Sequence, residues 1–205
     1  MNLKKEISKN MLDIEDWFLN SGIQIDNKKS FDYGGCHSWY DINKKGYAYI
    51  YPEITGYLIT FYCYLYSYKK KSVYVEKANN AAKWLINRMQ TKEGPFRCLK
   101  TSTKNSKFDS KKNLSFIFDN GIILNGLINL YKITNDVSLI KSAEKNAIWI
   151  ISKSMRNNGS LKPAYNLKTK KFFVKKSTWS TMSGGYHSKV AMGLLNLYSV
   201  NKKNW

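Results

Sequence analysis

The sequence predicts an all-α protein that consists of three helical hairpins in a row. Residues 126–131 read Gly-Leu-Ile-Asn-Leu-Tyr, and residues 193–198, which end 67 positions later, read Gly-Leu-Leu-Asn-Leu-Tyr. A tryptophan also recurs in alternate expected helices, as Trp17, Trp84 and Trp149. The links between helices alternate between short and long. Recurrence at such a period is typical of stacked repeats, because a single hairpin cannot bury its own apolar face.

Six helices are expected, and each has its own local signal. The first, residues 4–20, carries apolar side chains at helical spacing. Pro52 suits the first position of the second helix, residues 52–66, and Asp136 suits a helix cap. The other expected helices span residues 73–90, 119–131, 135–155 and 185–200. They group into three repeats of one domain covering 1–205, approximately 1–68, 69–134 and 135–205.

The recurring residues are more typical of a core than of a ligand site. A tryptophan at a fixed helical position usually packs against neighbouring helices, so Trp17, Trp84 and Trp149 are expected to be packing residues. The same interpretation applies to the two Gly-Leu-x-Asn-Leu-Tyr endings. Cys63 lies in an apolar run and is expected to be a small core residue.

The strongly basic composition does not indicate a specific nucleic-acid binder. The net charge is +20, but only three of the 34 basic residues are arginine. Proteins that read bases favour arginine for its bidentate geometry, and the lysines here are spread along the whole chain. We therefore expect no specific nucleic-acid partner.

Other compositional features bear on location and redox chemistry. The sequence contains no long apolar run and no apolar signal core behind Met1, so we expect no transmembrane segment and a cytoplasmic protein. Cys36, Cys63 and Cys98 show no paired spacing, which gives no disulfide framework.

The three long links, of about 25 residues each, are unusual for a helical array unless they have a function. All three precede an even-numbered helix, so they lie at one end of the array together with the N-termini of those helices. Loops on a rigid scaffold commonly carry binding and catalytic residues. This end of the array is therefore the predicted functional face.

Three short motifs open the even-numbered helices: Tyr-Pro-Glu-Ile-Thr-Gly-Tyr at 51–57, Phe-Asp-Asn-Gly at 118–121 and Ser-Gly-Gly-Tyr-His at 183–187. A turn, Thr-Lys-Glu-Gly-Pro-Phe at 91–96, follows the third helix. Together they resemble the (α/α) toroids of the six-hairpin glycosidase-like group, in which inner helices line a funnel. The resemblance implies a carbohydrate-active protein that acts on, or binds, a polysaccharide or oligosaccharide as a glycoside hydrolase, lyase or epimerase.

The chain carries about three hairpins, whereas a full toroid of this group has six. The sequence therefore predicts half of an (α/α)6 toroid, or an incomplete one. Exposed apolar flanks at the ends of an open array favour self-association, so a homodimer or a separate toroid half is an expected partner, besides a saccharide ligand.

Glu53 and Asp119 are the candidate catalytic residues. They occupy comparable inner-helix starts, and two carboxylates at the mouth of a funnel suit acid–base chemistry on a sugar. Each alone is explained more simply by the favourable effect of an acidic side chain on the helix dipole. For the two together, catalysis and this structural explanation are about equally favoured.

The candidate saccharide-binding residues are polar or aromatic side chains of the long loops and helix starts. Aromatic rings with polar tips suit stacking on the C–H face of a sugar, and Trp39 and Trp179 are the strongest of these candidates. The other candidates are His37, Tyr40, Asp41, Tyr57, Tyr186 and His187.

Two other functions stay open. One is a non-catalytic binding or assembly module for polysaccharide biosynthesis. The other is a zinc toroid similar to prenyltransferases and terpenoid cyclases, with ligands drawn from Cys36, His37, His187 and either Asp119 or Cys98. No metal-ligand spacing supports zinc, so we expect neither a metal nor a cofactor.

Overall fold

The computed structural model describes residues 3–98, 113–175 and 178–203. Its six α-helices are α1 (Leu3–Asn20), α2 (Pro52–Lys69), α3 (Ser72–Trp84), α4 (Ile117–Thr134), α5 (Val137–Trp149) and α6 (Ser188–Asn201). One π-helical turn continues α3 over Leu85–Met89, and another continues α5 over Ile150–Ser154. Short 3-10 turns cover Trp179–Thr181 and Gly185–His187. The expected helices are therefore confirmed, with ends that differ by a few residues.

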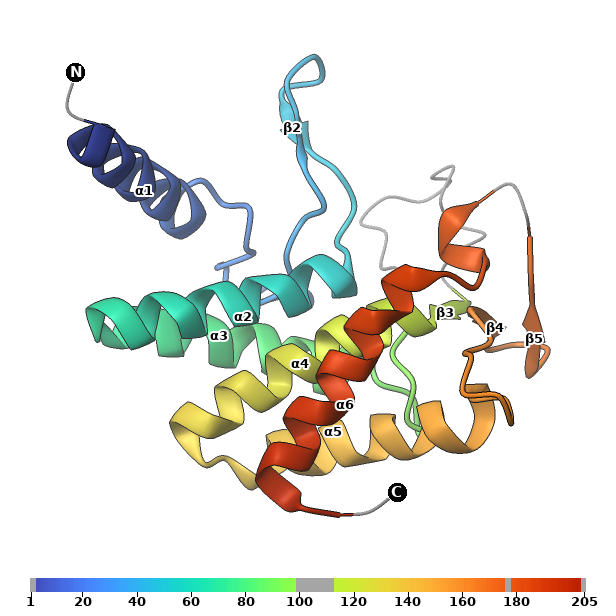
Figure 1. The fold of residues 1–205 in the computed structure, drawn as a ribbon. Helices are drawn as coiled ribbons and strands as arrows, with labels where there is room; N and C mark the ends of the chain where they lie inside the picture. Colours follow the sequence, from blue (N-terminus) through green and yellow to red (C-terminus); the bar gives the residue numbers. More distant parts are fainter. Residues whose placement is uncertain (1–2, 99–112, 176–177, 204–205) are drawn as a thin grey trace.

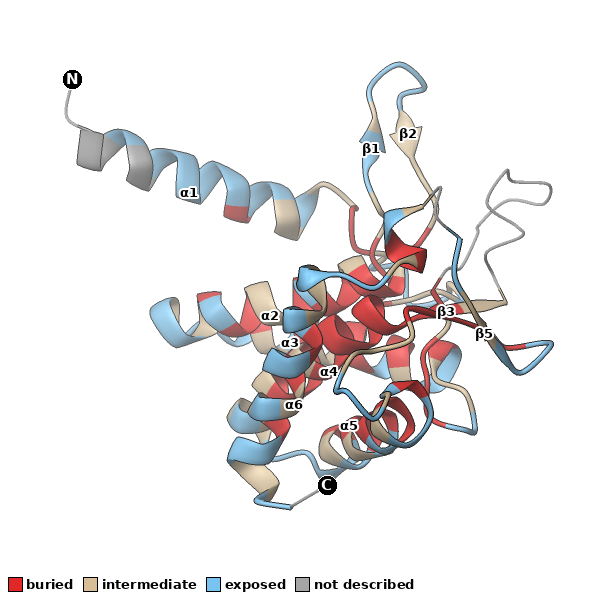
Figure 2. Cartoon of the chain, turned by 45° about the vertical axis from the view of Figure 1, so that its right-hand side comes forward, coloured by how far each residue is buried: buried red, intermediate tan, exposed pale blue. Residues whose placement is uncertain are grey.

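The helices form two layers of the predicted hairpin array. Helices α2, α4 and α6 pack side by side as the inner layer, and α3 and α5 cover it from outside (Figure 1). Helix α4 lies at the centre and is buried on almost all sides, through residues such as Ile123, Leu124 and Leu127 (Figure 2). In the described part of the chain, every helix is too short or too polar to cross a lipid bilayer.

All three inner helices end in the same way. The backbone N–H of the residue after each helix donates to the carbonyl of a tyrosine four positions earlier: Tyr66, Tyr131 and Tyr198. The donating residues, Lys70, Asn135 and Lys202, all have left-handed backbone conformations. The recurring tyrosine in the sequence thus marks a repeated helix ending.

Glycines set the spacing between the inner helices. A Cβ built on Gly126 of α4 would lie 2.6 Å from the carbonyl oxygen of Gly56 in α2. A Cβ on Gly121 would lie 2.7 Å from the Cα of Val190 in α6, and one on Gly193 would lie 2.7 Å from the carbonyl oxygen of Gly121. No side chain fits at these distances, so the close approach of the three backbones depends on glycine.

A repeated hydrogen-bond pattern ties the long loops to the outer helices. The side-chain amide of Gln24 donates to the carbonyls of Lys77 and Gly34, at 2.9 and 3.1 Å. The amide of Gln90 donates in the same way to Ser142 and Gly94, at 2.9 and 3.0 Å. The structural repeat therefore extends into the loops.

Helix α1 departs from the expected packing. It stands apart from the array (Figure 2), and Trp17 is 44% exposed, whereas Trp84 and Trp149 are 2% and 4% exposed. The prediction that all three tryptophans are packing residues was wrong for Trp17. Only the C-terminal part of α1 reaches the core, where buried Glu15 pairs with Lys69 and accepts from the Tyr74 hydroxyl.

The second Gly-Leu-x-Asn-Leu-Tyr ending is also less buried than predicted. Leu195 and Tyr198 of α6 are 67% and 42% exposed, whereas Leu127, Ile128 and Leu130 in the matching stretch of α4 are fully buried. The physical reason is position, because α4 has an inner helix on each side and α6 has one on a single side.

The long loops contain strands that the sequence analysis did not predict. Strands β1 (Tyr40–Asp41) and β2 (Gly46–Tyr47) form a projecting hairpin. Strands β3 (Leu114–Phe116), β4 (Ala164–Asn166) and β5 (Lys171–Phe173) form an antiparallel sheet in the order β3-β4-β5. All five lie on the side of the N-terminal ends of α2, α4 and α6 (Figure 1).

The glycine contacts give a direct stability prediction. We expect Gly121→Ala to lower the free energy of unfolding by about 1–3 kcal/mol, because the new methyl group meets the α6 backbone. Gly185→Ala is the matched control, because a Cβ there has no atom within 4 Å. Urea denaturation of both variants would measure the difference, and equal stability would contradict the role of Gly121 as a spacer.

Candidate active site

The two candidate catalytic carboxylates lie at the N-terminal ends of neighbouring inner helices. Glu53 is the second residue of α2 and Asp119 is the third residue of α4. Glu53 is 8% exposed and Asp119 is 1% exposed. Acidic side chains are favoured in a first helical turn, but the dipole effect does not require burial. The favourable helix-dipole effect therefore does not explain why both carboxylates are buried next to each other.

The two carboxylates influence each other's ionisation. Burial raises the pKa of Glu53, while the nearby Tyr51 hydroxyl and Asp119 carboxyl act in the opposite direction. Burial raises the pKa of Asp119 well above its ordinary value, and the charge of Glu53 raises it further. Both pKa values are therefore raised, chiefly by burial, and the two carboxyl groups titrate as a coupled pair.

The Asp119 carboxyl has an unusual hydrogen-bonding environment. Within residues 3–98, 113–175 and 178–203, neither of its oxygens has a hydrogen bond of good geometry, although the Tyr51 hydroxyl and the Glu53 carboxyl lie close enough to affect its pKa. A buried carboxyl group with so poor a set of hydrogen bonds is costly when charged. Such groups are typical of functional sites rather than of structural ion pairs.

Three tyrosines surround the carboxylates. Burial and the nearby Asp119 and Glu53 charges raise the pKa of Tyr51. The pKa of Tyr57 is also raised, by burial and then by the same two carboxylates. Tyr49 packs edge-on against Tyr51, with ring centroids 5.9 Å apart. Tyr57, one of the predicted saccharide-binding residues, therefore does lie near the predicted acid–base pair.

Asn120, next to Asp119, fixes the start of α4. Its side-chain oxygen accepts from the backbone N–H of Phe96 at 2.8 Å, and its amide donates to Ser115 and to the Phe116 carbonyl. Its own carbonyl accepts from Asn146 of α5 at 3.1 Å. Fully buried Asn120 thus joins the second loop, the sheet and α5 at the base of the site.

An aromatic cluster lies at the start of α6. Phe118, Trp179 and Tyr186 contact one another edge-on, with centroids 5.2–5.8 Å apart. Phe118 directly precedes Asp119 in α4, so the cluster lies at the same helix start as the second carboxylate. Trp179 is 52% exposed. Two predicted saccharide-binding residues, Trp179 and Tyr186, are therefore brought together.

His187 lies at the same helix start. Its Nε2 is buried and has no hydrogen-bond partner in the described segments. Burial lowers the pKa of His187, and the charge of Arg156 lowers it further. The imidazole is therefore favoured in its neutral form, in which it can accept or donate one hydrogen bond at each nitrogen.

The remaining predicted ligand-binding residues lie on or beside the β1–β2 hairpin. The rings of His37 and Tyr40 both pack against Tyr47, with centroids 4.9 and 5.1 Å away, and His37 Nδ1 lies 2.6 Å from the Ala48 carbonyl. Trp39 is 46% exposed. Asp41 accepts from the Lys44 backbone N–H at 3.1 Å, which stabilises the hairpin turn.

The residues of the zinc alternative are not gathered into a metal site in the described part of the chain, where no three His, Cys, Asp or Glu side chains cluster. Cys36 is fully buried, and burial raises the pKa of its thiol to about 12. Its backbone N–H bonds to Thr55 at 3.0 Å. A thiol with such a pKa is a poor metal ligand at neutral pH.

Sequence reasoning did not single out Tyr51 or Asn120, although both lie inside motifs that it quoted. Tyr51 immediately precedes the helix-opening Pro52, and Asn120 immediately follows Asp119. The one signal in the sequence that could have found them is their position within two residues of Glu53 and Asp119. Their roles depend on contacts with loops far away in the sequence.

The comparisons with known proteins agree with this architecture. The model of glycosyl hydrolase family 76 matches residues 24–158. Cellobiose 2-epimerase from Bacillus thermoamylovorans has a similar structure, with a TM-score of 0.77 at 16% identity over 100% of this chain and 52% of that chain. An α-mannanase of the same family from Bacteroides thetaiotaomicron gives a TM-score of 0.73 at 16% identity over 98% and 51%. A comparison with curated sequences finds no match.

These similarities confirm the predicted fold class. The chain has the helical-hairpin architecture of the (α/α)6 toroids in the six-hairpin glycosidase group. It spans about half the length of the similar solved structures.

The raised carboxylate pKa values predict a specific pH dependence. A carboxyl whose pKa is higher in the folded state stabilises the fold at low pH, and this contribution is lost as the pH rises through the folded value. We therefore expect Asp119→Asn to gain stability relative to wild type as the pH rises from about 4 to 8. Urea denaturation across this range measures the difference, with exposed Asp13→Asn as control. A difference that stays constant with pH would contradict the shift.

Proposed function

Since the chain belongs to glycosyl hydrolase family 76, we propose that it acts on a polysaccharide or oligosaccharide at the N-terminal ends of α2, α4 and α6. The observation that carries the proposal is the buried pair of Glu53 and Asp119, whose carboxyl groups shift each other's pKa. The family match supports a carbohydrate substrate, and the pair supplies acid–base chemistry suited to it.

The proposed chemistry uses the coupled ionisation of the pair. Cleavage of a glycosidic bond needs one protonated carboxyl, to donate to the leaving oxygen, and one ionised carboxylate. We assign the acid role to Asp119, the more deeply buried of the two, and the ionised role to Glu53, the more exposed. An epimerase reaction would use the same two groups to remove and return a proton at a sugar carbon.

The aromatic residues around this site would bind the sugar rings. Trp179 and Tyr186 pack against Phe118 at the start of α4, which also carries Asp119, and Tyr57 lies close enough to both carboxylates for their charges to raise its pKa. Trp39, Tyr40, His37 and Asp41 belong to the hairpin region that projects beside these helix starts (Figure 1), and His187 lies at the start of α6. Rings with exposed faces and polar tips suit stacking on saccharides.

A non-catalytic binding or assembly module is the second candidate function. It is favoured by the 1% exposure of Asp119, because a side chain so deeply buried reaches a bound saccharide poorly.

Activity measurements on Glu53→Gln and Asp119→Asn test the catalytic proposal. We expect either change to lower turnover about 10²–10⁴-fold, the usual contribution of a general acid or base. α-Mannan oligosaccharides are the first substrates to assay, followed by a broad glycan panel. Glu76→Gln, an exposed position on α3, is the matched control. Unchanged turnover in both site variants would exclude the acid–base pair, and saccharide binding without turnover by wild type would favour the binding module.

We infer that a second copy of the chain completes the toroid. Helix α6 exposes Met192, Leu195 and Tyr198 at one end of the array. At the other end, an apolar groove of about 560 Å³ runs along α2, with Tyr57 and Tyr64 among its lining residues. Packing each α6 against the α2 groove of the other copy would give six hairpins in a closed ring.

Sedimentation equilibrium tests this assembly. We expect a mass of twice 23.8 kDa for wild type at moderate salt, which screens the net charge of +20. Leu195→Glu should shift the protein to monomer, because a charge would be buried in the interface. Val137→Glu makes the same change at an exposed position on α5 and should leave the dimer intact. A wild-type monomer at all concentrations would contradict the inference.

A further inference from the structure

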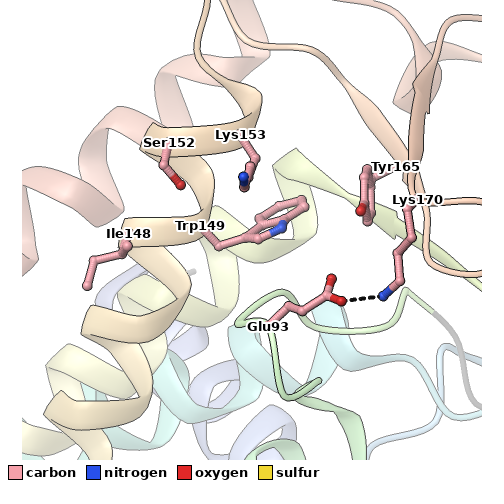
Figure 3. Close-up of a pocket in the computed structure, with 7 residues that line it drawn as sticks. All are labelled: Glu93, Ile148, Trp149, Ser152, Lys153, Tyr165 and Lys170. Carbon is pink, nitrogen blue, oxygen red and sulfur yellow. Dashed lines mark hydrogen bonds and ion pairs between the residues drawn. The ribbon is translucent and has the colours of Figure 1, made fainter.

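A second pocket lies outside the inner layer, at the C-terminal end of α5. It has a volume of about 460 Å³ and is lined by residues of α5 and its π-helical turn, of the second loop and of the β4–β5 region (Figure 3): Glu93, Ile148, Trp149, Ser152, Lys153, Tyr165 and Lys170. This volume is in the range of small-molecule sites. Neither Glu53 nor Asp119 lines it, so it is separate from the candidate active site.

The structural repeat explains why the pocket exists at this place. Trp149 in α5 corresponds to Trp84 in α3, and the glutamine hydrogen bonds that anchor the preceding loops are equivalent around both tryptophans. Gly34 approaches the backbone of α3 at Asn80, and Gly94 approaches that of α5 at Lys145 in the same way. The two loops therefore begin and end at matching points on the scaffold.

The two loops differ in length, and therefore in how much of the neighbouring tryptophan, Trp84 or Trp149, they cover. Ten positions separate Gln24 from Gly34, but only four separate Gln90 from Gly94. In the longer loop, Asp32 accepts a hydrogen bond from Trp84 Nε1 at 3.2 Å. The acidic residue of the shorter loop, Glu93, pairs with Lys170 instead, and in the described part of the chain Trp149 Nε1 donates no hydrogen bond. The pocket occupies the place that the longer loop covers in the preceding repeat.

The charges at the pocket rim are mostly positive. Lys153 extends from the π-helical turn toward the Trp149 ring, and Lys170 reaches from the opposite side (Figure 3). Lys170 pairs with Glu93 at 2.5 Å, and both side chains are about half exposed. An exposed pair of this kind contributes little stability, so a ligand can separate it at little cost. Two lysines and one glutamate leave a net positive rim.

The floor of the pocket is aromatic. Trp149 packs edge-on against Tyr165 at 5.3 Å and stacks with Phe172 at 5.9 Å. This packing holds the indole rigidly, with its N–H group free for a ligand. Trp149 is only 4% exposed, so it contributes its N–H group and not an open ring face. A fixed N–H donor between ammonium groups suits an anionic substituent on a sugar.

We infer that this pocket is a second saccharide site that binds an acidic sugar residue, such as a uronate, in a polysaccharide chain. The carboxylate pairs with Lys153 and Lys170, and the Trp149 N–H donates to a carboxylate or ring oxygen. Ser152 and Glu93 are placed to bond sugar hydroxyls. The site lies on the outer layer and binds without turnover, so it does not depend on catalysis by Glu53 and Asp119.

Binding measurements on the full chain test this inference. The probes are a tetrasaccharide that contains glucuronate residues and its carboxyl-reduced, neutral counterpart. By calorimetry we expect the acidic probe to bind wild type at least tenfold more tightly than the neutral one. Lys153→Ala should weaken the acidic probe about fivefold to tenfold, since a charge-assisted hydrogen bond is lost. Trp149→Phe keeps an aromatic floor without the N–H and should weaken binding as well.

The controls separate this site from the funnel and from simple charge attraction. Lys83→Ala removes the same charge at the position of α3 that corresponds to Ile148, and it should leave affinity unchanged. Glu53→Gln should also bind the acidic probe normally, whatever its effect on turnover. The inference is overturned if the acidic probe does not bind, if binding is lost in Glu53→Gln but kept in Lys153→Ala, or if inorganic phosphate displaces the probe at equal concentration.

Discussion

The close contact of the three inner helices is the constraint on which the rest of the structure depends. Backbone meets backbone at Gly56 and Gly126 between α2 and α4, and at Gly121 and Gly193 between α4 and α6. At such distances the helices cannot slide or rotate without collision, because the contact surfaces are carbonyl groups and α-carbons rather than flexible side chains. The positions of the three helix N-termini relative to one another, along the helix axes, are therefore fixed.

The contact between the inner helices also fixes the relative position of the two candidate catalytic carboxylates. Because α2 and α4 are held in register, Glu53 and Asp119 are forced into the same small buried volume, where each perturbs the other. Asn120 adds a second restraint by linking the start of α4 to the loop at Phe96 and to α5.

The sequence predicted the helices and their pairing, because these follow from local periodicity and internal recurrence. The functional end of the array stays a prediction. The sequence also proposed Glu53 and Asp119 as a pair, since acidic residues at comparable helix starts are visible without a structure, and the structure shows both buried and affecting each other's pKa. It could not predict the exposure of Trp17, which depends on how far α1 stands from its neighbours. The short strands were missed as well, because two or three residues carry no detectable alternation. Tyr51 and Asn120 could not be assigned, since their roles come from residues distant in the sequence.

The first two long loops are anchored by equivalent glutamine hydrogen bonds, and this bears on how the sequence of such a protein can evolve. The hydrogen bonds of Gln24 and Gln90 are the same although one loop is six residues longer between its anchors. Lengthening a surface loop costs little chain entropy. Insertions and deletions between these anchors are therefore a route by which a repeat can gain or lose a ligand site while its helices keep their packing. Each repeat of the toroid can in this way diversify independently of the others.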